Sequence, residues 1–203
     1  MTTYMLLMLW ITSCGNKDKE FVHIFEVECI QFHFGINESK FLECSAFQMS
    51  IPLNWEIVIK HSGTDTTYVL TEKLDTTNNV ELTDEEFDIK YNSFQTISLT
   101  FAEVYESLDY DVEFETVYQK IAKNEQNRIK ESGISTFNNR KANWIIYEDD
   151  SYKNDNLKCE SIMTCITNSK YYMWIIIQIF GEHESERRKC QAMGIIKTLK
   201  LKV

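Results

Sequence analysis

Proline and glycine are scarce in this chain of 203 residues, which has one proline and six glycines. Collagen-like, mucin-like and proline-rich linker architectures depend on these two residues and are therefore excluded. Six cysteines are too few for a disulfide scaffold at this length. Basic residues are also in deficit, since 21 Lys and Arg stand against 31 Asp and Glu, which gives a net charge of −10 with histidine neutral. A surface this negative repels phosphate backbones, so we expect no nucleic-acid partner.

The composition that remains is typical of one folded domain. Hydrophobic residues make up 43% of the chain and charged residues 26%, close to the averages of globular proteins, so wholesale disorder is excluded. No internal repeat, low-complexity run or linker interrupts residues 21–203. We therefore predict a single domain over this range.

Residues 1–14 have the pattern of an export signal. Residues 1–10 (MTTYMLLMLW) are apolar or neutral, and the chain turns abruptly polar behind Cys14. This apolar stretch is shorter than the roughly 20 residues that a transmembrane helix needs. It suits the hydrophobic region of a signal peptide. The alternative is that residues 1–14 form an ordinary buried strand or helix with Cys14 as a core thiol.

Residues 11–14 (ITSC) resemble a bacterial lipobox, in which a lipoprotein signal peptidase cuts before a diacylglyceryl-modified cysteine. The resemblance implies that residues 1–13 are removed by cleavage after Ser13. It further implies that Cys14 carries lipid, including a palmitate chain, and that residues 14–20 are a flexible tether. It also implies a membrane-anchored lipoprotein of the bacterial cell envelope, on the periplasmic or the surface face.

The apolar spacing along residues 21–203 predicts an α+β domain with an antiparallel sheet. We expect strands over residues 21–34, 47–51, 56–60, 67–72, 96–105, 134–149, 156–167 and 171–180. Pro52 ends the second of these because proline cannot donate to the ladder. We expect one helix over 109–130, terminated by the Ser132-Gly133 that follows it. We expect a second helix over 183–197, which buries Cys190.

Several local motifs resemble the PsbP/DcrB/Mog family. They are residues 49–55 (MSIPLNW), with a Pro-x-x-Trp corner, residues 138–142 (NNRKA), the apolar strand 171–180, and residues 195–199 (IIKTL). The resemblance covers residues 45–203 and implies an α-β-α sandwich, an antiparallel sheet flanked by helices. Family members include a photosystem extrinsic subunit, a Ran-binding protein and bacterial envelope lipoproteins. The resemblance thus implies a binding or assembly role, with no shared catalytic residues to carry over.

The cysteines behind Cys14 lack the spacing of metal or redox sites, since no CxxC or HExxH motif occurs. Cys159 and Cys165 lie on one face of a predicted strand about 20 Å apart, too far to pair, and we expect buried thiols. Cys29 and Cys44 are a candidate disulfide that would close a hairpin in an exported protein. The alternative is that both are core thiols.

The remaining polar and aromatic clusters favour ordinary structural roles. His183 lies in an acidic helix start, and the carboxylates of residues 84–88 and 148–150 lack the pattern of a calcium loop. No glycine-rich phosphate loop occurs. Trp144 and the aromatic residues of 171–174 favour a core position over a ligand site. We therefore predict no metal, no cofactor and no catalytic residue.

The leading hypothesis is a non-enzymatic, lipid-anchored envelope protein whose domain binds or assembles with a protein partner, and which touches the membrane through acylated Cys14. One alternative is an envelope hydrolase or a small-molecule or lipid carrier that uses a pocket between the sheet and a helix. The other is a soluble cytoplasmic partner-binding protein.

Overall fold

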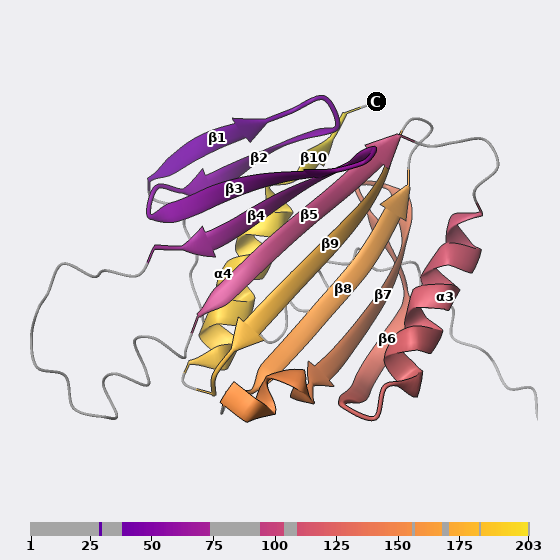
Figure 1. Ribbon diagram of the computed structural model, residues 1–203. Helices are drawn as coiled ribbons and strands as arrows, with labels where there is room; N and C mark the ends of the chain where they lie inside the picture. Colours follow the sequence, from indigo (N-terminus) through magenta and orange to yellow (C-terminus); the bar gives the residue numbers. More distant parts are fainter. Residues whose placement is uncertain are drawn as a thin grey trace, which may run out of the picture.

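A computed structural model describes Cys29 and residues 38–73, 94–103, 109–155, 157–167, 171–182 and 184–202 (Figure 1). Its elements are β1 (Ser39–Glu43), β2 (Phe47–Pro52), β3 (Trp55–Ser62), β4 (Asp65–Glu72), β5 (Gln95–Glu103), α3 (Tyr110–Lys123), β6 (Asn127–Phe137), β7 (Arg140–Asp149), the 3-10 helix η2 (Asp150–Asp155), β8 (Cys159–Thr167), β9 (Tyr171–Phe180), α4 (Ser185–Lys197) and β10 (Lys200–Leu201). The predicted signal peptide, the tether and the strand predicted over 21–34, Cys29 apart, lie outside the described residues. Neither helix in the described ranges is both long and apolar enough to cross a bilayer.

The described strands form two antiparallel sheets. The main sheet has the order β3-β4-β5-β9-β8-β7-β6, and the small sheet has the order β1-β2-β10. Most neighbours in the main sheet follow each other along the chain, but β5 pairs with β9 from Gln95–Ile179 to Glu103–Tyr171. This pairing places β3–β5 beside the later strands β6–β9, so the main sheet is complete only when both groups of strands are present. The predicted α+β class with an antiparallel sheet is confirmed.

The central strand β9 is buried on one face and partly buried on the other, as an apolar run between two covering layers requires. Ile175 and Ile177 are fully buried on one face, in the larger core cluster. Trp174 and Ile176 point to the other face and pack in a second cluster. The strand predicted over 171–180 has the observed bounds.

Helix α4 and the small sheet cover the first face (Figure 1). Phe47, Met49 and Ile51 alternate inward along β2 and are almost completely buried. The hydroxyl of Thr198, at the end of α4, accepts from the backbone N–H of Ser50 at 2.9 Å. Its single proton has two acceptors within reach, the carbonyl of Ile195 at 2.7 Å and that of Ser50 at 3.1 Å. One side chain thus joins α4 to β2, the two covers of this face.

Helix α3 covers the other face, over β6 and β7 (Figure 1). The carboxylate of Asp109 caps its amino terminus by accepting from the backbone N–H groups of Asp111 and Val112. Phe114 stacks on Trp174 with ring centroids 5.9 Å apart. This contact fastens the amino-terminal half of the helix to the centre of the main sheet.

Two predictions around α3 are wrong. The helix ends at Lys123 and not near residue 130, because Asn124 takes an extended conformation and its carbonyl accepts from the N–H of Asn127. Residues 127–137 then form the edge strand β6, whose charged outer positions suit a solvated helix face equally well. The strand predicted over 134–149 is a hairpin, since Asn138 and Asn139 both have positive φ, 49° and 60°, as a tight hairpin turn requires.

Gly133 lies opposite Trp144 in the β6–β7 ladder, and the indole covers it. A Cβ at this position would stand 2.9 Å from the ring carbon Cζ2 of Trp144. We predict that Gly133→Ala lowers the free energy of unfolding by about 1–3 kcal/mol through overpacking. Alanine in a strand is otherwise no worse than glycine, so the sign is diagnostic. Urea titration measures the loss, the neighbouring exposed Ser132→Ala is the control, and wild-type stability of Gly133→Ala would refute the contact.

Candidate functional site

A charged groove of about 530 Å³ lies where the ends of β6, β7 and β8 meet the start of α4. It is lined by Arg128, Lys130, Glu148, Asp150, Lys158, Cys159, Glu160, Ile179, Gly181, Glu182, Ser185 and Glu186. Five carboxylates and three cations line this space, so the groove is acidic like the whole chain.

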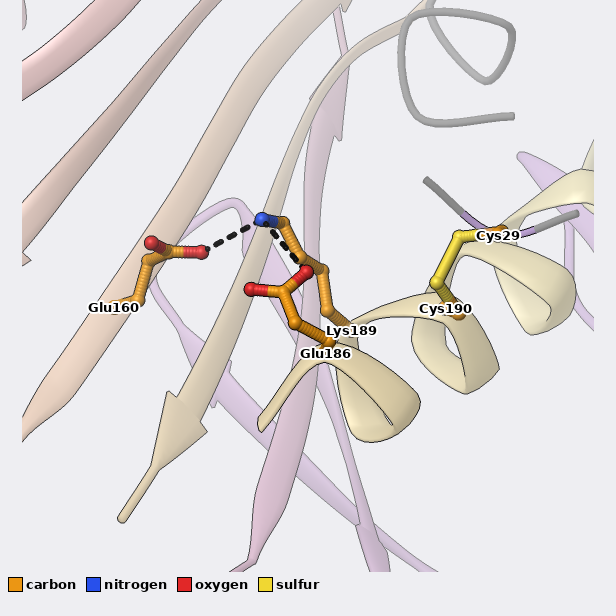
Figure 2. Close-up of a disulfide and its surroundings, with 5 residues drawn as sticks. All are labelled: Cys29, Glu160, Glu186, Lys189 and Cys190. Carbon is orange, nitrogen blue, oxygen red and sulfur yellow. Dashed lines mark ion pairs between the residues drawn. A yellow bond between two sulfur atoms is a disulfide. The ribbon is translucent and has the colours of Figure 1, made fainter. Parts of the chain in front are cut away.

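Glu160 of β8 is the centre of the groove, because it joins two lysines from different elements. Its Oε2 accepts from Nζ of Lys130 at 2.6 Å, and its Oε1 lies 3.1 Å from Nζ of Lys189. Lys189 is 10% exposed and also lies 3.7 Å from Glu186, so that it bridges the sheet and the first turn of α4 (Figure 2). The chain of ion pairs continues from Lys130 to Glu148 of β7 at 2.9 Å.

Burial and charge act in opposite directions on this cluster. Burial pushes the pKa of Glu160 upward, but the hydrogen bond from Lys130 and the charge of Lys189 outweigh it, so its pKa lies below the usual range. Burial lowers the pKa of Lys130, but its hydrogen bonds to Glu160 and Glu148 raise the pKa by more, so the net shift is upward. Glu160 and Lys130 therefore stay charged at neutral pH, and their ion pair holds the two strands of the groove together.

The outer ion pairs of the groove are exposed. Arg128 donates to Glu148 through Nε at 2.8 Å, and Lys158 pairs with Glu182 across the mouth. Exposed pairs of this kind contribute about 0–1 kcal/mol because water and salt screen them. They can exchange their intramolecular partner for the charges of a ligand at little cost, unlike the pair of Glu160 and Lys189.

Cys159 lines the groove but is not an activated nucleophile. Burial raises its pKa to about 11, and its sulfur shares hydrogen bonds with Ser161 and Gln178. A thiol with this pKa is protonated at neutral pH, and the thiol form is a poor nucleophile. Cys165 is buried under α3 with a pKa raised to about 12. Both cysteines are the buried thiols that the strand pattern predicts.

A disulfide joins Cys29 to Cys190 of α4, next in sequence to Lys189 (Figure 2). The candidate pair Cys29–Cys44 is wrong, because Cys44 is free and packs at the border of the core. Cys190 is buried, as predicted, but it is bonded to Cys29. The two bonded residues are 161 positions apart with Cα atoms 5.4 Å from each other. Only the tertiary fold brings them together, so no local spacing could indicate the bond.

The other predicted site residues are scattered or lie outside the described residues. Ser13, Cys14 and His183 are in the second group. Glu148 belongs to the groove, while the carboxylate of Asp149 accepts from the N–H of Ser151 at 3.0 Å. Across the described ranges, no group of three or more His, Cys, Asp and Glu side chains is arranged to hold a metal ion. Trp144 and Tyr171 are core residues, as predicted.

Sequence reasoning missed Lys130, Glu160 and Lys189, the three residues on which the groove depends. A weak signal exists, since Glu160 is a charged residue in an otherwise apolar or small-residue strand, CESIMTCIT. Its partners come from β6 and α4, 30 and 29 residues away.

We predict that Glu160→Gln destabilises the fold by about 2 kcal/mol at neutral pH, because it removes the carboxylate that Lys130 and Lys189 share and leaves each lysine with one remaining anion, Glu148 or Glu186. The folded-state pKa of Glu160 is depressed from 4.5. Its stabilisation is therefore complete above the unfolded value and is lost as the pH falls through the folded value. When unfolding by denaturant is measured at a series of pH values, the free energies of unfolding of wild type and variant should converge at acidic pH.

The matched control is Glu43→Gln, which removes a more exposed carboxylate paired with Lys202 at 2.6 Å. We expect a change below about 1 kcal/mol for it at every pH. A difference in the free energy of unfolding between wild type and Glu160→Gln that stays constant with pH would contradict the role of the ionised carboxylate.

Comparison with known proteins identifies the fold and no family. No protein-family model and no curated sequence matches this chain. LpqN of Mycobacterium tuberculosis, involved in cell envelope biogenesis, is 7% identical, covers 82% of this chain and 91% of its own, and has a TM-score of 0.52. Cyanobacterial PsbP from Synechocystis covers 83% and 95% with 11% identity and a TM-score of 0.49. The Ran-binding protein Mog1p of Saccharomyces cerevisiae matches 81% of this chain and 95% of its own, with 9% identity and a TM-score of 0.47. The chain thus shares the fold of LpqN, at an identity that shows the fold alone.

Proposed function

We propose that this chain is a non-enzymatic, lipid-anchored binding protein of the bacterial cell envelope. Its domain binds a protein partner through the charged groove between β6–β8 and α4. The observation that carries the binding role is the groove itself, which combines a fixed ionic centre with a rim of exchangeable ion pairs.

The cysteines support an exported location. Disulfides form and persist in oxidising compartments and are rare in the cytosol. The bond ties Cys29, in the segment that follows the predicted tether, to Cys190 of α4. It fits the lipobox-like residues 11–14, and it disfavours the alternative of a cytoplasmic protein. LpqN, which has the same fold, is involved in cell envelope biogenesis.

The groove supports binding over hydrolysis. A hydrolase needs an activated nucleophile or a free acid and base pair. The central carboxylate Glu160 is held by two lysines, and the thiol of Cys159 has its pKa raised to about 11. A peptide or protein surface with charges of both signs can replace the outer pairs of Lys158 and Glu182 while the centre stays intact.

The anchor makes one prediction. Intact-mass spectrometry of protein purified from membranes should show that residues 1–13 are lost and that Cys14 carries acyl chains. Cys14→Ala should remove the acyl mass, whereas Cys44→Ala, which changes a cysteine within the domain, should leave it. An unprocessed Met1, or Cys14 without acyl mass, would refute the anchor and leave the groove untouched.

The groove makes another prediction. A photo-crosslinking amino acid in place of Lys158, on the exposed rim, should give one discrete adduct with another protein in intact cells. The same residue in place of Lys120, on the exposed side of α3, should give none. Raising the salt concentration should weaken the adduct in membrane preparations, because exposed charges are screened. No adduct, or equal adducts at both positions, would refute the groove as the binding surface.

A further inference from the structure

Strand β3 ends the main sheet and pairs with β4 alone among the described strands. From Val58 to Ser62 every residue is exposed, and the side chains of Val58 and Ile59 are about half exposed, at 51% and 50%. An edge strand offers a row of backbone donors and acceptors to any strand that approaches it. Natural proteins usually protect such an edge with a bulge, a proline or several lysines.

The register defines which groups this edge offers. The N–H of Lys73 donates to the carbonyl of Asn54 at 2.7 Å, so Asn54 belongs to the hydrogen-bonded positions facing β4. Hydrogen-bonded and non-hydrogen-bonded residues alternate along an antiparallel strand. The even-numbered residues of β3 therefore bond β4, and Ile57, Ile59 and His61 turn their N–H and C=O groups to the open edge.

The start of this edge is closed and the rest is open. Lys40 of β1 donates to the carbonyl of Trp55, the first outward-facing group of β3. This contact confirms the assignment of the odd positions to the open edge. No bulge interrupts the pairing of β3 with β4 from Trp55 to Ser62. Of the protective devices, the open part of the strand has Lys60 alone.

The opposite edge of the main sheet is protected. Strand β6 carries a bulge between Ile129 and Glu131, which disrupts the ladder and twists the strand. Lys130 lies in the bulge and turns into the charged groove, where it binds Glu148 and Glu160. The two edges therefore differ, since β6 has a bulge and β3 has none.

The sequence of β3 is complementary to itself. When two copies run antiparallel with Val58 opposite Val58, Glu56 of each copy lies opposite Lys60 of the other, and Ile57 lies opposite Ile59. Val58 and the two charged pairs then occupy non-hydrogen-bonded positions, where side chains approach most closely. The isoleucine pairs occupy the hydrogen-bonded positions, whose backbone groups are the ones that point outward.

We propose that two copies of this chain associate through their β3 edges in this register, forming a continuous sheet about a two-fold axis at Val58. The neighbouring registers lack the complementarity. With Ile59 on the axis, Lys60 faces Val58 and Glu56 faces Ser62. With Ile57 on the axis, Lys60 faces Asn54 and Glu56 faces Val58. Only the Val58 register satisfies both charges and keeps the apolar residues together, which is the isologous contact that two-fold symmetry requires.

The contact that Glu56 makes with Lys73 inside the chain competes only weakly. Glu56 lies 3.6 Å from Nζ of Lys73, and the two side chains are 60% and 59% exposed. A pair this open is worth little and can be exchanged. The contact between the open parts of the two edges, from Glu56 to Lys60, is small, so we expect a dissociation constant in the micromolar range or weaker.

Charge exchange tests the register. In sedimentation velocity of the full chain over a concentration series, wild type should dimerise, and Glu56→Lys and Lys60→Glu should each dimerise at least about tenfold more weakly, because each places like charges opposite one another twice. An equimolar mixture of the two variants should restore the dimer as a heterodimer. The double variant Glu56→Lys/Lys60→Glu should dimerise by itself.

The control variant is Lys120→Glu on α3, which makes the same charge change away from β3 and should leave the dimer unchanged. Circular dichroism verifies that each variant is folded. Three results would overturn the proposal: wild type that stays monomeric at millimolar concentration, single variants that dimerise like wild type, or a mixture no tighter than its components. Monomeric wild type would also be the result if β3 received a strand from a different protein.

Discussion

The whole architecture depends on one constraint, which is that the central strands of the main sheet are apolar on both faces. Ile175 and Ile177 of β9 face one layer, while Trp174 and Ile176 face the other. Backbone alternation makes this unavoidable once a strand is uniformly apolar, and each face then needs a cover. Helix α3 supplies one cover, and α4 with the small sheet supplies the other. The second cover joins segments from both parts of the chain, because β10, which follows α4, pairs with β2.

The same constraint decides where charge can go. With the middle of the sheet apolar, charged side chains are confined to strand ends, edges and helix surfaces. Where β8 begins beside the first turns of α4, Glu160 and Lys189 are too buried to be left to water, and each needs a counter-charge. Lys130 joins them from the bulge of β6. The groove is thus the place where the apolar core ends and the charged surface begins, and this explains why its centre is fixed while its rim is exchangeable.

The limits of sequence reasoning here follow the distance over which each interaction acts. The apolar run of β9 and the Pro52 that ends β2 are local signals, and both were sufficient to place the element. The boundary of α3 was not, because residues 124–130 are polar enough for a solvated helix or for an edge strand, and the extended conformation of Asn124 decides between them. The bond of Cys29 to Cys190 and the contacts of Glu160 with Lys130 and Lys189 join elements that only the folded sheet brings together. The fold class was therefore predictable and the site was not.

The net charge of −10 bears on association as much as on solubility. Two acidic copies repel one another at long range, but salt screens charges beyond about 8 Å at physiological ionic strength. A cross-strand pair of Glu56 and Lys60 acts within contact distance, where screening by salt is small. If Cys14 is anchored, copies share one membrane surface, and their effective concentration rises without any new contact. A sheet edge too small to give a stable dimer in dilute solution would then be sufficient on the membrane. The tether and the edge would thereby act together, with the anchor supplying proximity and β3 supplying register.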